Sequence, residues 1–414
     1  MTLRLSESGS AREPDGAGET GRFARAPAGA APACVAGAGP RSPGSAGERL
    51  EVELRDVGED LVPGAGAAWC SSAMPELRVR RDDFAVCDLV AGEGLRVNDL
   101  DEGEAQLRVE RFALTTNNVT YAVLGDQLGY WKPFPAPAGW GRIPAWGYAT
   151  VTASRSPAVA EGARVFGLVP MASYVTMRPA PHPLGFVESA PHRADLRRIY
   201  NQYLAVEGDG EDAALVWRPL FVTSVLLDLD LGEAGLPEAV VLTSASSKTA
   251  YALAHLLRDR PVRTVGLTSP VRRAWVSGLG LYDAVLGYDE LERLDPQRTV
   301  VLIDFTGDGA LVQRLHQRLG GRLQRSLLVG YTHRRGEAVA PPASAVRYSA
   351  PAEMERRVRS LATDYAEAWA AFAPVAERTL RIERLSGGDA LVEAYRALLA
   401  GRADPRLAHV VSLP

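Results

Sequence analysis

Apolar runs and amphipathic segments alternate between about residues 237 and 345, and this alternation constrains the fold more than any other feature. The runs AVVLTS, VRTVGLTS, AVLGY, RTVVLIDF and RSLLVGYT are predicted strands, and the segments KTAYALAHLLRDR, VRRAWVSGLG and ALVQRLHQRLG have helical spacing of apolar residues. Nearly continuous apolar strands are typical of strands buried on both faces. The pattern therefore predicts an α/β fold with a doubly wound parallel sheet.

The chain before this region has a different texture. From Met74 onward, segments such as ELRVRRDDFAVCDLV and EAQLRVERFALT alternate apolar and polar residues, as strands of an antiparallel sheet do. The segments 191–206 and 214–231 are predicted helices that lead out of this β-rich part. Residues 1–73 are rich in Ala, Gly, Pro and Ser and have little to bury, so we expect a disordered leader.

The last part of the chain, after residue 345, predicts one long helix over 351–374 and then a strand, a helix and a strand. We expect this ending to return to the β-rich domain. The predicted organisation is a leader at 1–73, a β-rich domain at 74–225, a nucleotide-binding type of domain at 226–345 and a returning segment at 346–414.

Composition and charge exclude several classes of function. A net charge of −4 over 414 residues gives no basic field for nucleic acid or an anionic membrane. No apolar run reaches the roughly 18–20 residues of a membrane helix, and we see no secretory signal. Three scattered cysteines, Cys34, Cys70 and Cys87, suit neither a disulfide framework nor a structural zinc site. These features predict a cytoplasmic protein.

The stretch TSASSKTA, residues 243–250, joins the first parallel strand to its helix and has three interpretations. Ser247-Lys248-Thr249 resembles the end of a P-loop, but the first glycine of that motif would fall on Leu242, inside the strand. Laid over G-x-G-x-x-G, a Rossmann turn places its glycines on Ala245, Ser247 and Ala250, which are all small. The third interpretation is a turn that binds nothing. The Rossmann interpretation makes the following residues candidates for binding a cofactor diphosphate: Ser244, Ala245, Ser246, Ser247, Lys248 and Thr249.

The tip of the second parallel strand, VGLTSPVRR, bears on the choice of cofactor. It carries no Asp or Glu, which an NAD-dependent enzyme would use to hold the ribose 2′-hydroxyl. It offers Thr268, Ser269 and Arg272 instead, with Arg273 beside them. Hydroxyl and guanidinium groups suit a 2′-phosphate, so this tip predicts NADP (NADPH) as cofactor. The alternative is that Arg272 and Arg273 form a solvated helix start.

Taken in order, five segments resemble the medium-chain dehydrogenase/reductase superfamily, in its zinc-free, quinone-reductase-like branch, and most closely the bacterial DUF2855 family. They are TTNNVTYAVLGD, IPAWGYATVTASRSPAVAEGARVFGLVP, VSGLGLYDAVLGYDEL, VVLIDFTGDG and LLVGYTH. The resemblance covers about residues 74–414. It implies a GroES-like β-barrel domain joined to a Rossmann domain. PAWGYA lacks the His and Cys that zinc alcohol dehydrogenases carry in that stretch, so no metal site is expected.

The resemblance also implies where the catalytic residues lie. Asn118 and Tyr121 occupy the turn beside the nicotinamide; Tyr121 would donate a proton or polarise a carbonyl, and Asn118 would hold substrate or carboxamide. Thr223, followed by Ser224, falls where the family has a hydroxyl residue under the nicotinamide ring. The structural alternatives are a packed Tyr121 with a satisfied hydroxyl, an Asn118 that caps the turn, and hydroxyl groups bonded back to their own helix.

Two further groups of residues have a less specific pattern. Gly330 and Tyr331 end the last predicted strand, at the edge of the sheet where ligands bind in open α/β folds. An aromatic segment could line an apolar substrate pocket or simply pack in the core. Its members are Tyr130, Trp131, Phe134, Trp140 and Trp146.

These observations predict an NADPH-dependent, zinc-free reductase that transfers hydride to an activated C=C bond or a carbonyl of a small apolar substrate. The alternative is a non-catalytic protein that keeps the fold and binds a ligand or a protein partner. By analogy with the family, a homodimer would form by edge-to-edge pairing of the Rossmann sheets.

Overall fold

The structure is a computed structural model, and it describes residues 74–92, 99–330, 339–358 and 360–414. The chain divides into two units, Met1–Ala67 and Ala68–Pro414, and the second contains all of the described residues. The predicted leader at 1–73 lies outside them. Among the described residues, no helix is long and apolar enough to cross a membrane.

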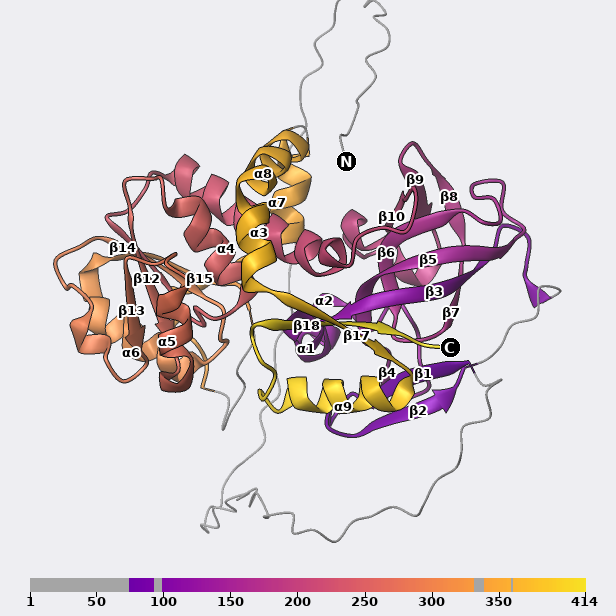
Figure 1. Cartoon of the computed structure of the whole chain (residues 1–414), viewed down its shortest axis with the longest axis horizontal. Helices are drawn as coiled ribbons and strands as arrows, with labels where there is room; N and C mark the ends of the chain where they lie inside the picture. The colour runs from indigo at the N-terminus through magenta and orange to yellow at the C-terminus, as the bar shows by residue number, and fades with distance from the viewer. Residues whose placement is uncertain (1–73, 93–98, 331–338, 359) are drawn as a thin grey trace, which may run out of the picture. The chain divides into compact units, whose positions relative to one another are not determined.

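Antiparallel strands dominate the first part of the second unit (Figure 1). A small sheet has the order β2-β1-β4 and contains β1 (Pro75–Arg80), β2 (Cys87–Ala91) and β4 (Trp140–Gly141). The larger sheet contains β3 (Ala105–Leu114), β5 (Pro144–Ser154), β6 (Arg164–Pro170), β7 (Tyr174–Met177), β8 (Pro179–His182), β9 (Gly185–Glu188), β10 (Gln202–Ala205), β17 (Arg381–Ser386) and β18 (Leu407–Ser412). Its order is β17-β18-β3-β5-β6-β10-β9-β8, with β7 paired to β3.

The C-terminal strand β18 is an internal strand of this larger sheet. It runs antiparallel to β3, with His409 opposite Leu114, and parallel to β17. The helix α9 (Gly388–Leu399) joins β17 to β18 and contacts β1 and β2. The strand-helix-strand prediction for this ending is therefore confirmed, and its last strand joins the larger antiparallel sheet.

The segment 191–206 is not the helix that its apolar spacing predicts. It forms two short 3-10 turns, Pro191–Arg193 and Arg198–Tyr200, followed by β10. The side chain of Arg193 explains the fold-back, because it is 2% exposed and donates hydrogen bonds to Asn201 Oδ1, the carbonyl oxygen of Tyr200 and the hydroxyl of Tyr203. A buried guanidinium requires such partners, and a continuous helix would carry them away from it.

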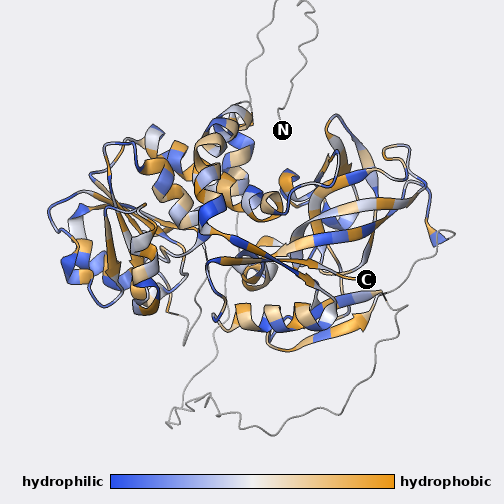
Figure 2. Cartoon of the chain, in the orientation of Figure 1, coloured by the Kyte–Doolittle hydropathy of each residue, from blue (hydrophilic) through white to orange (hydrophobic). Residues whose placement is uncertain are grey.

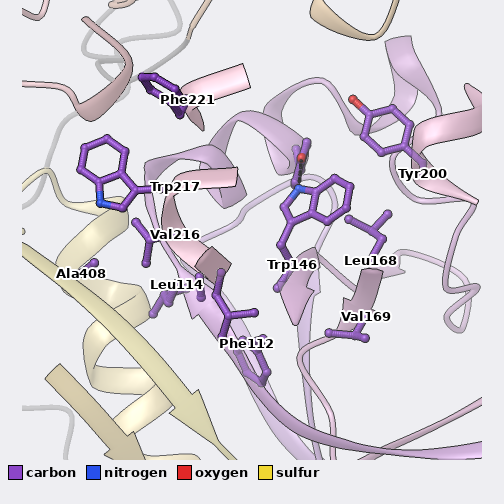
Figure 3. Close-up of a cluster of buried hydrophobic side chains, with 14 of the residues drawn as sticks. Phe112, Leu114, Trp146, Leu168, Val169, Tyr200, Val216, Trp217, Phe221 and Ala408 are labelled. Carbon is purple, nitrogen blue, oxygen red and sulfur yellow. Dashed lines mark hydrogen bonds between the residues drawn. The ribbon is translucent and has the colours of Figure 1, made fainter. Parts of the chain in front are cut away.

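A long helix, α3 (Asp212–Ala234), leads from the antiparallel part into the parallel part. Its buried residues lie all round the helix, because β3, β5, α4 and α8 all contact it. Trp217 and Phe221 project from it into an aromatic cluster (Figure 3), and the Phe221 ring stacks on Phe372 with centroids 4.8 Å apart. Burial of these rings on α3 binds the two parts of the unit together.

The parallel sheet has the order β13-β12-β11-β14-β15-β16, and all of its pairings are parallel. Its strands are β11 (Ala239–Leu242), β12 (Arg263–Thr268), β13 (Ala284–Gly287), β14 (Val300–Asp304), β15 (Leu323–Leu328) and β16 (Val346–Arg347). In chain order this is 3-2-1-4-5-6, the order of a dinucleotide-binding Rossmann fold. Its strands are largely hydrophobic (Figure 2), as strands buried on both faces require.

Helices follow the parallel strands where the sequence predicts them. They are α4 (Lys248–Leu257), α5 (Pro270–Gly278) and α6 (Gly309–Leu319). The single helix predicted over 351–374 is instead two helices, α7 (Ala350–Arg356) and α8 (Leu361–Thr379). Arg357, at the end of α7, is buried and donates to the carboxylate of Glu233 on α3, so this ion pair fixes the chain where the helix is interrupted.

Candidate functional site

The strand order fixes where a ligand would bind in the parallel sheet. The order reverses between β11 and β14, and in open α/β sheets the ligand crevice lies at the carboxyl ends of the strands beside such a reversal. The turn 243–247, which follows β11, lies at this point and leads into α4. The candidate cofactor residues of the sequence therefore occupy the switch point of the sheet.

The turn is tight even though it lacks glycine. Ser244 has φ +46°, and it is the one non-glycine residue with a positive φ in the described part of the chain. A left-handed conformation destabilises a serine by about 1 kcal/mol, whereas a glycine adopts it without this cost. The next residue, Ala245, is fully buried, and its amide donates to Leu267 O at 2.9 Å. Ala245 O accepts from the hydroxyl of Tyr282 at 2.8 Å.

Room for the Ala245 methyl group comes from the neighbouring strand. A Cβ built on Gly266 of β12 would lie 2.8 Å from Ala245 Cβ and 2.9 Å from Tyr282 Cδ1. Gly266 therefore supplies the close approach that a glycine in the turn would otherwise provide. A search for glycines within the turn misses this, because the compensating residue lies on another strand.

We predict that Gly266→Ala lowers the free energy of unfolding by about 1–3 kcal/mol, since the added methyl overpacks against Ala245. Ala245→Gly in the same chain should recover part of that loss. The measurement is urea unfolding followed by circular dichroism. Gly278→Ala is the control, because a Cβ at Gly278 meets no atom within 4 Å; equal losses at Gly266 and Gly278 would contradict the packing argument.

The start of α4 has a side-chain cap and outward-facing backbone amides. Ser247 is the N-cap, and its hydroxyl accepts from the amide of Ala250. The amides of Lys248 and Thr249 come before the first intrahelical acceptor, so they point out of the helix N-terminus. Together with the helix dipole, free amides at this position favour a phosphate group. Ser246 lies in the same turn and contacts Arg272, as described next.

Arg272 lies across the turn from Ser246. Its Nη1 is 3.3 Å from Ser246 Oγ, and its Nη2 is 3.3 Å from the carbonyl oxygen of Ala403. Both bonds are long for N–H···O. Thr268 is the buried last residue of β12, and Ser269 is the N-cap of α5 without a side-chain capping bond. These three residues form the polar tip that the sequence predicts for a 2′-phosphate.

The side chain of Lys248 points toward the C-terminal segment and not into the turn, where a phosphate would bind. Its Nζ donates to the carbonyl oxygens of Pro405 (3.2 Å) and Leu407 (3.0 Å), which belong to the C-terminal segment. Burial lowers the pKa of Lys248 to about 8. The Lys248 ammonium therefore links the turn to the C-terminal segment. Since its hydrogen bonds go to these carbonyl groups, it would act on a bound phosphate through its positive charge and not through a direct hydrogen bond.

Asp304 is the last residue of β14, and its side chain bonds to Thr243, the first residue of the 243–247 turn. Its carboxylate accepts from Thr243 Oγ1 and Thr306 Oγ1, both at 2.6 Å, and from the amide of Gly307 at 2.9 Å. Burial raises the pKa of Asp304. This use of its oxygens, together with the strand order, disfavours the P-loop interpretation, in which the carboxylate would bind Mg²⁺. Among the described residues, no group of three or more His, Cys, Asp and Glu side chains could hold a metal ion.

Gly330 lies at the end of β15, beside the same edge. Its amide is 3.2 Å from Asp304 O, and a Cβ on it would lie 2.8 Å from the carbonyl oxygen of Phe305. The position therefore requires a residue without a side chain. Tyr331, the other residue predicted there, lies outside the described residues.

Asn118 and Tyr121 both lie on α1 (Thr116–Val123), and both are buried. Asn118 forms a capping box with Thr115, and its Nδ2 donates to Pro144 O at 2.9 Å. It thereby fixes α1 against β5. The hydroxyl of Tyr121 accepts from Trp146 Nε1 at 2.9 Å. After α1 comes the one-turn helix α2 (Gly125–Leu128).

Two further tyrosines surround Tyr121. The hydroxyls of Tyr130 and Tyr200 lie 2.9 Å apart, and the ring centroids of these two residues lie 4.6 Å and 6.3 Å from that of Tyr121. Figure 3 shows Tyr200 near Trp146, whose ring also stacks on Phe166. Burial raises the pKa of all three phenols, so they stay protonated and neutral. Tyr200 is not among the site residues that the sequence predicts, because helical spacing over 191–206 does not bring it to Tyr121.

Thr223 and Ser224 lie on α3, and their hydroxyls bond to carbonyl groups. Thr223 Oγ1 donates to Pro219 O at 3.3 Å, one turn back. Ser224 Oγ lies 2.9 Å from Thr249 O and thus ties α3 to α4. A hydroxyl that donates in this way keeps lone pairs that can accept from a ligand N–H group.

Comparison with known proteins agrees with this fold. CurA from Vibrio vulnificus in complex with NADPH matches with a TM-score of 0.58 and 14% identity, over 82% of this chain and 99% of CurA. CurK enoyl reductase matches with a TM-score of 0.51 and 13% identity, over 83% of this chain and all of CurK. Mycobacterial Rv1454c complexed with NADPH matches with a TM-score of 0.51 and 16% identity, over 82% and 100% of the two chains. No curated protein matches the chain.

The strand order, the switch-point turn and these matches define a medium-chain dehydrogenase/reductase fold, with GroES-like and Rossmann domains. Residues 112–404 match a family model described as "Protein of unknown function (DUF2855)". The chain belongs to this family.

Proposed function

We propose that the protein is an NADPH-dependent, zinc-free reductase that transfers hydride to an activated C=C bond or a carbonyl of a small apolar substrate. The observation that carries the proposal is the pairing of a phosphate-type turn at the switch point with Arg272, 3.3 Å from Ser246 of that turn. The small residues of the turn would let a diphosphate approach the backbone closely. The guanidinium of Arg272 would supply the positive charge that a 2′-phosphate requires.

The residues have separate roles in this proposal. When bound, NADPH supplies the hydride. The first-turn amides of α4 and the hydroxyls of Ser244, Ser246 and Ser247 would hold the diphosphate. Arg272, with Thr268 and Ser269, would hold the 2′-phosphate. With the hydride supplied by the cofactor, the chain would need to supply orientation and one proton.

The substrate side is provided by the antiparallel part of the fold. Tyr121 would donate a hydrogen bond, and finally a proton, to the substrate oxygen, because its hydroxyl accepts from Trp146 and keeps its own hydrogen. Asn118 fixes the helix that carries Tyr121. Thr223 would accept from the carboxamide of the nicotinamide. The rings of Trp146 and Phe166, stacked with centroids 5.5 Å apart, would favour a flat apolar substrate.

The second candidate function is a non-catalytic binding protein that retains the fold. Two observations favour it: Lys248 already donates to carbonyl oxygens of its own chain, and the hydroxyls of Tyr130 and Tyr200 bond to each other. Both reduce the number of free donors for cofactor and substrate.

A titration of the full chain with NADPH and NADH, followed by nucleotide fluorescence, decides between the two candidates. The reductase proposal expects micromolar NADPH binding that is tighter than NADH binding. Turnover of enones or quinones in a screen would then complete the assignment. Absence of binding for both nucleotides would reject the reductase and leave the binding-protein candidate.

The pH dependence of binding gives a prediction about Lys248. Its pKa of about 8 means that the ammonium charge is present below pH 8 and lost above it, whereas an exposed lysine keeps its charge to about pH 10. We expect the Kd for NADPH to rise about threefold between pH 7 and pH 9 as this charge disappears from the switch point. In Lys248→Met the Kd should be higher at pH 7 and nearly flat over the same range. An unchanged pH profile in the variant would show that another group titrates.

A further inference from the structure

The chain that leads from α9 into β18 forms a turn at residues 401–407, here called the C-terminal turn, whose last residue is the first of β18. This turn belongs to the segment that returns to the antiparallel sheet, but its backbone contacts Arg272 and Lys248, the two cations at the switch point. Arg272 Nη2 approaches the carbonyl oxygens of Gly401 (3.5 Å) and Ala403 (3.3 Å), and Lys248 Nζ donates to those of Pro405 and Leu407. The cofactor site of the Rossmann domain is therefore completed by a segment from outside that domain.

Asp404 lies at the centre of this turn. The carbonyl groups that contact Arg272 and Lys248 belong to its two neighbours, Ala403 and Pro405, so the turn places Asp404 next to the residues that bind both cations. Burial lowers the pKa of Lys248, and the Asp404 charge offsets part of that effect. The pKa of Asp404 is lowered by its hydrogen bond with Arg406 and, to a smaller extent, by the charge of Arg272. The carboxylate is partly buried, with 30% of its side chain exposed.

Arg406 clamps the Asp404 carboxylate in place. Its Nε lies 2.9 and 3.0 Å from the two carboxylate oxygens, its Nη2 lies 2.6 Å from Oδ2, and its backbone amide donates to Oδ1 at 2.9 Å. Such a two-pronged pair holds the carboxylate in one orientation and offsets part of its charge. The net field at Arg272 therefore depends on both members of the pair.

An acidic group near the 2′ position of the adenosine ribose decides between the two nicotinamide cofactors. It accepts from the ribose hydroxyl of NAD(H), and it repels the 2′-phosphate of NADP(H). The tip of β12 supplies no such group, since Thr268, Ser269 and Pro270 follow one another there. The C-terminal turn brings one in from more than a hundred residues further along the chain, next to the arginine that would hold the phosphate.

We propose that Asp404 is a specificity-determining residue of the cofactor site, which weakens the preference for NADPH over NADH that Arg272 creates. The inference rests on the proposed function. Arg406 is the positioning residue that orients Asp404 and offsets its charge.

Two variants of the full chain test this, because they have opposite expected effects. Asp404→Asn removes the negative charge and keeps the acceptor oxygen, so the Kd for NADPH should fall about three- to tenfold while the Kd for NADH stays within twofold. Arg406→Gln leaves the carboxylate without its cation, so the Kd for NADPH should rise by a similar factor. A merely structural role of the turn would shift both variants, and both nucleotides, in the same direction, and that result would overturn the proposal. Thermal unfolding of each variant shows whether the fold is retained.

The fragments 2′-AMP and 5′-AMP separate a failure of this inference from a failure of the proposed function. If wild type binds neither dinucleotide, the reductase proposal fails. The Asp404 inference is then tested by the binding of 2′-AMP alone. Tighter 2′-AMP binding in Asp404→Asn, with 5′-AMP unchanged, supports the inference. Equal binding of 2′-AMP by wild type and variant, or no binding by either, overturns it.

Discussion

Replacing Tyr121 by phenylalanine is expected to lower kcat for an enone or quinone substrate on the order of 100-fold or more, the usual contribution of a positioned proton donor. KM should change less than threefold, because the ring and its packing remain. Tyr121 is the one phenol of the cluster whose hydroxyl receives an indole N–H, from Trp146 at 2.9 Å. That bond would stabilise the oxygen as its proton leaves for the substrate.

Tyr130→Phe is the matched control for this prediction. It deletes a hydroxyl from the same cluster and breaks the 2.9 Å contact with Tyr200, but it leaves the Tyr121–Trp146 bond intact. Steady-state kinetics of both variants, with substrate varied at saturating NADPH, should show a loss below fivefold for Tyr130→Phe. A kcat for Tyr121→Phe within threefold of wild type would assign the proton to another donor or to water.

Arg272→Ala should have the second large effect, on cofactor binding. Loss of a guanidinium that makes charge-assisted bonds to a phosphate should weaken NADPH binding about 100-fold, that is by roughly 2.7 kcal/mol. NADH lacks the 2′-phosphate, so its Kd should change less than threefold. Titration by nucleotide fluorescence at fixed ionic strength gives both constants.

The neighbouring residue provides the control for Arg272. Arg273 is next in the chain, but its Nη1 pairs with Glu290 Oε2 at 2.6 Å, away from the turn. Arg273→Ala should leave both constants within twofold of wild type. Similar losses in the two variants would mean that NADPH responds to the overall charge of α5 and that no specific 2′-phosphate site exists at Arg272.

Much of the fold follows from sequence periodicity. The parallel strands and their helices were predictable because each forms from consecutive residues, and buried strands such as β11 are apolar throughout. The position of the turn at 243–247 followed from the same pattern. Strand β16 did not, because Val346 and Arg347 form only a two-residue strand whose pairing with β15 is set by tertiary contacts.

The site was less predictable, since its side chains are oriented by distant segments. The sequence places Lys248 at the start of a helix, but the acceptors that turn it away are Pro405 and Leu407. The position of Tyr200 depends on the buried guanidinium of Arg193, whose partners come together only after the segment folds back. No local pattern encodes such contacts, and helical spacing in 191–206 pointed to the wrong structure.

The place of β18 in the larger sheet has a consequence for how the protein is made. β3 emerges from the ribosome early, but its partner strand, residues 407–412, is synthesised only after the whole Rossmann domain. Until then the edge of β3 that receives β18 has open backbone groups, while the parallel sheet can already form. Co-translational folding should therefore complete the parallel sheet first, and the larger antiparallel sheet can gain its last strands only after residues 407–412 have been synthesised.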